Sequence, residues 1–282
     1  MIIQLHAGLG DTVALTAGVR ERKRRYPDDD ILLDVSYPEV FIGNPFAKVL
    51  AEKSSDKTAV IANRGWGGQE RFGDTAFNLA RRLGIDRLAD TTPEVFLSRE
   101  ERLYGKEKVW KAKKERHVPA VAFDPWTTWP SRRWRGWHEL TMMLANAGVR
   151  RIRLGADIQD IDGESPNPDE GVYSLNLYGR TTVREAAAVL AAADLYIGND
   201  SGLFHLAAAV GTPQVIVFAN RNWYTRGYWN TTSLFHHQEC DSRCGRRCFR
   251  PFGKECLSQL PAQYVFECVK IVLKRMGRGY AV

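Results

Sequence analysis

The stretch "ADLYIGNDSGLFHLAAAVGTPQVIVF", residues 193–218, sets a polar turn between two apolar runs. Its order predicts a strand over 194–198, a helix over 201–211 and a second strand over 214–218. A strand, a helix and a second strand in this order form a unit with parallel strands. The sequence at this point therefore favours an α/β fold built on a parallel sheet.

Four residues of functional type gather where the first of these strands ends. They are Asp200, Ser201, Gly202 and His205. One interpretation is a capped helix packed on the sheet, with Asp200 and Ser201 as caps. The other is a site for a charged ligand, because the first N–H groups of a helix lack partners and attract anions. Both interpretations stay open from this stretch alone.

The same alternation runs along most of the chain and predicts two lobes. Strands are expected at 1–5, 30–35, 58–62, 94–97, 119–123, 150–155 and 171–176. Helices are expected at 11–25, 74–84, 98–116, 136–148, 181–193 and 260–276. Because the series restarts after the charged segment 111–117, we expect two Rossmann-like lobes, 1–116 and 117–282, with a ligand at the carboxyl ends of the strands.

Composition narrows the class of protein. The 282 residues are 44% hydrophobic and 26% charged, as in soluble globular proteins. No apolar run is long enough to span a bilayer and no signal-peptide pattern opens the chain, so we expect a cytoplasmic protein. The net charge of +7 indicates an anionic partner, such as a phosphate group, a nucleic acid or a membrane surface.

Two further strand-end loops carry polar groups. The first, "HAGLGDTVALT" (6–16), holds Gly8 and Gly10, which allow a ligand to come close, and Asp11, which either caps a helix or faces a cleft as a base. The second, "DPWTTWPSRRWRGW" (124–137), offers hydroxyls from Thr127 and Thr128 beside arginine and tryptophan side chains. Guanidinium groups suit phosphate oxygens, so a phosphate site is about as well supported as a basic surface loop.

Three segments together resemble glycosyltransferase family 9, the ADP-heptose:lipopolysaccharide heptosyltransferases. "GNDSGLFHLAAAVGTPQVIVF" (198–218) resembles the family's C-terminal signature and "TTWPSRRW" (127–134) its phosphate loop. "LHAGLGDTVALTAGVR" (5–20) resembles its N-terminal loop, although Gly18 stands where the family usually has proline. The resemblance implies a GT-B fold, with an N-terminal acceptor lobe and a C-terminal nucleotide-sugar lobe facing a cleft.

The resemblance also implies an activity and a role for each residue. The reaction would be inverting transfer of a sugar, heptose first, from a donor such as ADP-heptose to a hydroxyl of a lipopolysaccharide-type glycan, without a catalytic metal. Asp11 would be the acceptor base, and Arg132, in place of the usual lysine, would stabilise the leaving diphosphate. The donor phosphates would be held by Thr127, Thr128, Ser201, Gly202 and His205. Asp200 would hold the donor sugar or orient its loop.

The cysteines form a separate feature, since all five lie after residue 239. In a reducing compartment disulfide bonds are not expected, which leaves metal binding or simple burial. The spacing of the cysteines does not match the strong zinc signatures. The resemblance extends to autotransporter heptosyltransferases, where four cysteines hold iron. Carried over, it implies a structural iron or zinc site formed by Cys240, Cys244, Cys248 and Cys256 in the segment 240–256.

Other functions remain open at this stage. The cysteine cluster would favour a protein side chain as the acceptor, which makes the chain a protein O-heptosyltransferase. The basic charge and the tryptophans beside arginines are also compatible with a protein that binds or modifies nucleic acid. A sugar-binding module without activity is a further alternative. The basic patches also allow peripheral association with the inner face of a membrane.

Overall fold

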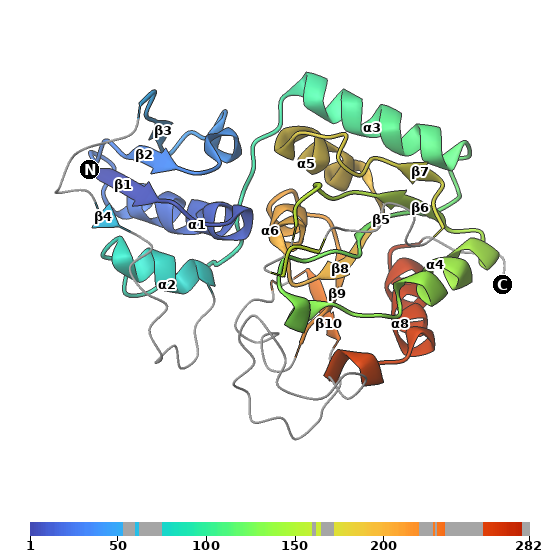
Figure 1. Cartoon of the computed structure of the whole chain (residues 1–282). Helices are drawn as coiled ribbons and strands as arrows, with labels where there is room; N and C mark the ends of the chain where they lie inside the picture. Colours follow the sequence, from blue (N-terminus) through green and yellow to red (C-terminus); the bar gives the residue numbers. More distant parts are fainter. Residues whose placement is uncertain are drawn as a thin grey trace.

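The computed structural model describes residues 1–52, 60–61, 75–159, 162–164, 172–219, 228, 230–234 and 256–277. These residues form two parallel sheets that lie side by side, each with its own helices (Figure 1). In the described residues, no helix has the length and the apolar character needed to cross a membrane.

The first sheet has four strands in the order β3-β2-β1-β4. These are β3 (Lys48–Val49), β2 (Leu32–Val35), β1 (Ile2–Leu5) and β4 (Val60–Ile61). Ile3 pairs with Leu33 on one side and with Val60 on the other, so β1 is central. Helices α1 (Leu9–Arg25) and α2 (Thr75–Arg82) pack together on this sheet, and the 3-10 turn η1 (Pro38–Phe41) follows β2.

The second sheet has six strands in the order β10-β9-β8-β5-β6-β7. They are β10 (Thr231–Leu234), β9 (Gln214–Val217), β8 (Leu195–Asn199), β5 (Ala120–Asp124), β6 (Arg150–Arg153) and β7 (Leu175–Asn176). Successive residues of β5 point to opposite faces: Ala120 and Ala122 join one buried cluster, while Val121 and Phe123 join the other. The sheet is therefore buried on both faces, as parallel sheets are.

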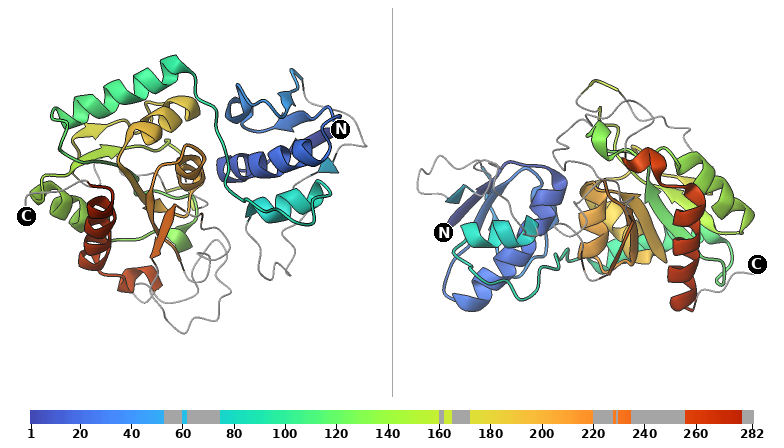
Figure 2. Two further views of the ribbon diagram at one scale, coloured as in Figure 1. Left: turned by 180° about the vertical axis from the view of Figure 1, so that it is seen from behind. Right: turned by 90° about the horizontal axis from the view of Figure 1, so that it is seen from below.

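Different helices cover the two faces of the second sheet (Figure 2). One face packs against α3 (Arg99–Lys113), α5 (Val183–Ala192) and α6 (Gly202–Ala209). The other packs against α4 (Trp137–Asn146) and α8 (Ala262–Arg275), with the short turns η2 (Pro130–Arg132) and η4 (Cys256–Gln259) nearby in the chain. The first face shares one continuous apolar cluster with the core of the first sheet, so the two lobes are packed together.

The segment between the lobes differs from the expectation. The apolar pattern predicts a strand over 94–97, but these residues run as irregular backbone from α2 to α3. Their hydrogen bonds go to a helix of each lobe: the Glu94 amide donates to Thr16 Oγ1 at 2.9 Å and the Val95 amide to the Ala209 carbonyl at 3.2 Å. Helix α3, which a division at residue 116 assigns to the first lobe, packs against α5 of the second sheet. The exact division between the domains stays a prediction.

Arg184 on α5 ties the lobes together. Its guanidinium donates to both carboxylate oxygens of Glu101 on α3 and lowers the pKa of that carboxyl group. The same group donates to the carbonyl oxygens of Glu39 at 3.1 Å and Ile42 at 3.3 Å, beside η1 of the first lobe. The side chain is only 10% exposed, so this single arginine joins three segments in a shielded place.

Candidate functional site

The starts of α1 and α6 meet where the two lobes face each other. Gly10 lies against the ring of His205, and a methyl group built on Gly10 would come within 2.5 Å of His205 Cδ2. Leu9 and Gly202 are also close, because a Cβ at Gly202 would lie 3.0 Å from Leu9 Cβ. Segments nearly 200 residues apart in the sequence are thus in direct contact, and only glycine leaves room for the approach.

Asp11 lies in the first turn of α1 and is half-buried. The N-cap is Gly8, so Asp11 is not the capping residue of this helix. Its carboxylate is close to Gly8, at 3.6 Å from the position of a Cβ on that residue. The helix N-terminus stabilises the negative charge of Asp11. Asp11 thus lies two residues inside the helix and not at its N-cap, and its carboxylate stands at the start of the helix, next to the junction of the lobes.

His205 is held in one orientation by aromatic neighbours. It is 2% exposed, and its Nδ1 lies 2.6 Å from the hydroxyl of Tyr228. The Phe204 ring packs against it at 4.6 Å between centroids. The edge of the imidazole that carries Nε2 faces Gly10. Tyr228 could not be selected from the sequence, because the segment that contains it matches no pattern of a site.

Arg132 and Asp200 link two strand-end loops of the second sheet. Arg132 follows β5 and Asp200 follows β8, and Nη1 of Arg132 lies 3.3 Å from Oδ2 of Asp200. The same nitrogen is 3.4 Å from the Asp200 carbonyl oxygen. The guanidinium stacks on the ring of Trp129 at 3.9 Å. Asp200 is 1% exposed, so its charge is compensated at close range by a stacked, oriented cation.

The hydroxyl residues lie around this pair. Thr127 is buried and its Oγ1 accepts from the Trp129 amide at 3.4 Å, while Thr128 and Ser201 are half-buried. Ser201 is the N-cap residue of α6, but its side chain makes no capping hydrogen bond. Ser201 thus occupies the expected cap position without a side-chain capping bond, and Asp200 is paired with Arg132.

The tryptophans of the second loop have two different roles. Trp134 and Trp137 belong to the core and are 2% and 1% exposed. Trp126 and Trp129 instead carry arginines on their faces, with Arg133 at 3.7 Å from the Trp126 ring. Arg133 also pairs with Glu164 at 2.7 Å. The loop is thus a stacked arginine-tryptophan layer at the carboxyl end of β5.

A third group of polar side chains continues the site along the sheet edge, and the sequence did not single it out. Asp124 ends β5 and accepts from the Trp126 amide at 3.0 Å. After β6, Asp157 accepts from the Tyr178 hydroxyl at 2.8 Å; burial and this bond raise the pKa of Tyr178 to about 12. Arg153 of β6, in a run of basic residues, is fully buried and lies over the Tyr178 ring. An aspartate directly after an apolar strand run was the available signal for Asp124.

This arrangement can bind an anion and take up a proton. Arg132 and the first turn of α6 supply positive potential on the side of the second sheet, where His205 also lies. Asp11 supplies a carboxylate on the side of the first sheet. The structure brings together the loops of all three predicted motifs, with Asp200 joined to Arg132 and Gly10 set against His205. A carboxylate that can accept a proton, opposite a positively charged site that binds anions, suits the transfer of a group from a phosphate leaving group to an acceptor.

The predicted metal ligands lie mostly outside the described residues. Cys240, Cys244 and Cys248 fall in the segment 235–255, which the structure does not describe. Cys256 starts η4 and is buried in the apolar cluster of the α4 and α8 face. Within the described ranges there is no group of three potential metal ligands. The metal site therefore stays a prediction.

The sequence matches the model of glycosyltransferase family 9 (heptosyltransferase) over residues 74–249. Lipopolysaccharide heptosyltransferase 2 of Salmonella typhimurium is 31% identical to this chain over 107 residues, which are 36% of this chain and 31% of that protein. For the first three curated relatives the match spans between 31% and 52% of their own length.

Solved structures share the fold over nearly the whole chain. A family 9 glycosyl transferase from Veillonella parvula superposes with a TM-score of 0.76 at 15% identity, over 97% of both chains. The iron-containing dodecameric heptosyltransferase TibC of Escherichia coli, solved with ADP-D-β-D-heptose, gives 0.71 at 16% identity over 98% of this chain and 76% of that one. Together with the two parallel sheets, these similarities show a GT-B fold.

Proposed function

The chain belongs to glycosyltransferase family 9, and from this premise we propose that it transfers heptose from ADP-heptose to a hydroxyl group of a lipopolysaccharide-type glycan. The relatives named lipopolysaccharide heptosyltransferase support the acceptor class, and TibC with ADP-heptose supports the donor. The expected place of action is the cytoplasm, at the inner face of the membrane, with no metal in the chemical step.

In the proposed reaction the acceptor oxygen attacks the anomeric carbon of the heptose. A new C–O bond forms while the bond from that carbon to the ADP diphosphate breaks on the opposite face, which inverts the configuration. Asp11 takes the proton of the acceptor hydroxyl as a general base. Arg132 and the first N–H groups of α6 stabilise the negative charge that develops on the diphosphate. Thr127, Thr128, Ser201, Gly202 and His205 hold its oxygens, and Asp200 orients Arg132.

The observation that carries this proposal is the contact between the two helix starts. Gly10 lies against the His205 ring, and Asp11 is the next residue in the chain. The proposed base therefore lies close to the histidine of the proposed diphosphate site. A base and an anion site on opposite lobes are what an inverting transfer requires, because nucleophile and leaving group lie on opposite sides of the reacting carbon. If Asp11 only stabilised the start of α1, nothing would require the buried imidazole of His205 to lie against Gly10.

Binding of the donor is the first test. We expect ADP-heptose at 100 times its dissociation constant to stabilise the protein by about 2.7 kcal/mol in thermal unfolding. Arg132→Gln should lose most of this gain. Arg133→Gln serves as the matched control, because Arg133 is the neighbouring arginine and pairs with the exposed Glu164 instead.

A panel of nucleotide sugars gives the outcome that would contradict the proposal. Stabilisation by UDP-glucose or GDP-mannose, but not by ADP-heptose, would mean that the proposed donor is wrong and that the proposed transferase activity stands. Failure of every nucleotide sugar to bind would remove the transferase function. Incubation with radiolabelled ADP-heptose and heptose-free lipopolysaccharide then tests the acceptor, and label on a protein instead would favour the protein O-heptosyltransferase.

The nucleic-acid alternative has less support from the described contacts. The two arginines beside tryptophan are turned into the molecule, since Arg132 is 11% exposed and Arg133 is 20% exposed. Their guanidinium groups already cover the faces of Trp129 and Trp126, so a base could stack there only by displacing them. RNA binding with a steep dependence on salt would restore this alternative.

Iron or zinc bound by Cys240, Cys244, Cys248 and Cys256 remains part of the proposal as a structural element. TibC, which shares the fold, is an iron-containing protein, and this supports iron first. Elemental analysis of the purified protein should find about one metal per chain, and Cys244→Ser should lower that content. Metal-free wild-type protein with intact donor binding would remove the metal and keep the transferase.

A further inference from the structure

A pocket lies on the second lobe, away from the loops that carry the proposed transfer. It has a volume of about 310 Å³, at the lower end of the range for small-molecule sites. Its walls come from α3, the turn that follows, the end of α5 and Asp194 at the start of β8. Because Asp194 precedes β8 while Asp200 follows it, the pocket sits at the opposite end of the sheet from the anion site.

One acidic group in this pocket is already satisfied. The Asp194 carboxylate accepts from Lys113 Nζ at 2.7 Å and from the Ala120 amide at 2.8 Å. Lys113 and Asp194 are 8% and 6% exposed, so they form a shielded pair with no net charge. This pair forms the inner wall of the pocket. Any net positive charge of the pocket therefore comes from other residues.

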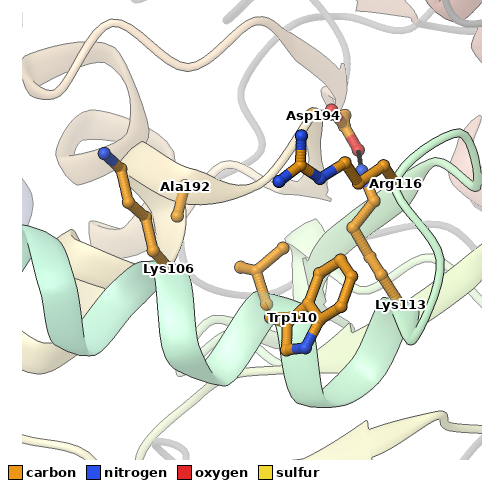
Figure 3. Close-up of a pocket in the computed structure, with 7 residues that line it drawn as sticks. Lys106, Trp110, Lys113, Arg116, Ala192 and Asp194 are labelled. Atoms are coloured by element: carbon orange, nitrogen blue, oxygen red, sulfur yellow. Dashed lines mark hydrogen bonds and ion pairs between the residues drawn. The ribbon is translucent and has the colours of Figure 1, made fainter.

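Two cationic side chains lie over the pocket, and no described residue gives either of them an acidic partner. Lys106 and Arg116 both line it and are exposed, and neither has an ion pair among the residues that the structure describes. In Figure 3 the Arg116 side chain extends from the turn after α3 back toward Lys106, on the same side of the helix as Trp110. Two unpaired cations around one hollow favour an anion there.

Trp110 adds an apolar surface between these cations. Its side chain lines the pocket and is 52% exposed, which is high for the largest apolar side chain. Val109 and Ala192 extend the apolar part of the wall. An indole face next to guanidinium and ammonium groups suits a ligand with an anionic head and a planar or aliphatic body.

We propose that this pocket binds an organic phosphate, with the phosphate between Lys106 and Arg116 and the apolar body on Trp110. The site is separate from the donor site and does not depend on the proposed transfer. The same chemistry can come from a soluble phosphate ester or from the headgroup of an anionic lipid, and the two sources are separated by the choice of probe.

The test uses the whole 282-residue chain and the fluorescence of Trp110, taken as the difference between the wild type and Trp110→Phe. Phenyl phosphate is the soluble probe and inorganic phosphate tests the charge alone. Vesicles of phosphatidylcholine with and without phosphatidylglycerol are the lipid probes. We expect saturable binding of phenyl phosphate or of the anionic vesicles, and weaker binding of inorganic phosphate.

Matched variants separate the pocket from general basic charge. Lys106→Gln and Arg116→Gln should each weaken the binding by about tenfold, the effect expected for one charge-assisted contact. Lys111→Gln removes the same charge from the same helix outside the pocket and should leave binding within about twofold. Arg132→Gln should leave this signal unchanged, because it acts at the other end of the sheet.

Two results would overturn the proposal. The first is the absence of any saturable Trp110 signal with all four probes. The second is equal weakening by Lys106→Gln and Lys111→Gln, which would mean that the helix attracts anions by its overall charge only. Circular dichroism of each variant shows that the fold is kept, and the exposed positions of both lysines make loss of folding a minor concern.

Discussion

Helices α1 and α6 both begin at the junction of the lobes, but they begin in different ways. The start of α1 has a glycine cap, Gly8, and a half-buried carboxylate, Asp11. The start of α6 is enclosed: His205 is fixed by Tyr228, and Asp200 is fixed by Arg132. The start of α6 is therefore held rigidly, whereas the start of α1 is less enclosed around its half-buried carboxylate.

Replacing the half-buried carboxylate should have the largest effect. In Asp11→Asn the side chain keeps its size but loses the ability to take a proton. We expect the rate of transfer to fall by about 10²–10⁴-fold, with little change in the dissociation constant of the donor. Initial rates and calorimetric titration with ADP-heptose measure the two quantities, and transfer at the wild-type rate would exclude Asp11 as the base.

Replacing the cation on the enclosed side should come next. Arg132→Gln removes the charge that pairs with Asp200 and, in the proposed transfer, stabilises the leaving diphosphate, so kcat/KM should fall by about 10²–10³-fold. Arg132→Lys should recover part of the loss, because lysine restores the charge but not the stacking on Trp129. Arg133→Gln should stay close to the wild type in the same assay; a loss as large as that of Arg132→Gln would assign the effect to the loop in general.

The contact between the two helix starts can be tested by one added methyl group. Gly10→Ala places a carbon 2.5 Å from a buried imidazole ring that cannot move freely, so the free energy of unfolding should fall by about 1–3 kcal/mol. Gly8→Ala is the matched control, since its methyl group would meet only Asp11 Oδ2 at 3.6 Å. Urea unfolding measures both variants, and equal losses would mean that the lobes are not in contact at Gly10.

The smallest effect is expected at the fixed imidazole. Tyr228→Phe removes the hydrogen bond to His205 Nδ1 and keeps the aromatic packing on Phe204. The free energy of unfolding should fall by about 1 kcal/mol. Donor affinity should fall by less than about tenfold, because His205 then loses a fixed orientation and not a charge. Unchanged affinity would show that the orientation of His205 does not matter for the donor.

The sequence predicts most of the fold because hydrophobic patterns of strands and helices are local. The strands at 194–198 and 214–218 and the helix between them are present almost as expected. The short strands β3 and β10 escape prediction, since Lys48–Val49 and Thr231–Leu234 lack an apolar run. The segment 94–97 has such a run, but its amides donate to the Thr16 side chain and to the Ala209 carbonyl instead of to a neighbouring strand. These partners lie far away in the chain, so the local sequence does not reveal them.

For the site, the sequence identifies residues but not their partners. The motifs contain both Asp200 and Arg132, yet nothing in their spacing indicates that they form a pair. Tyr228 and Arg184 could not be found, because each acts through residues far away in the chain. The burial of Arg153 could not be predicted for the same reason, because the basic run 150–153 gives no sign of the aromatic rings that cover it in the fold.

The contact of Gly10 with His205 has a mechanical consequence. The lobes also meet at Leu9 and Gly202 and through Arg184, and in any rotation of one lobe against the other the points nearest to these contacts travel least. Asp11 follows Gly10 directly, so its separation from His205 would change little in such a rotation. In the proposed transfer, the base and the diphosphate site would then keep their spacing while the acceptor enters and leaves.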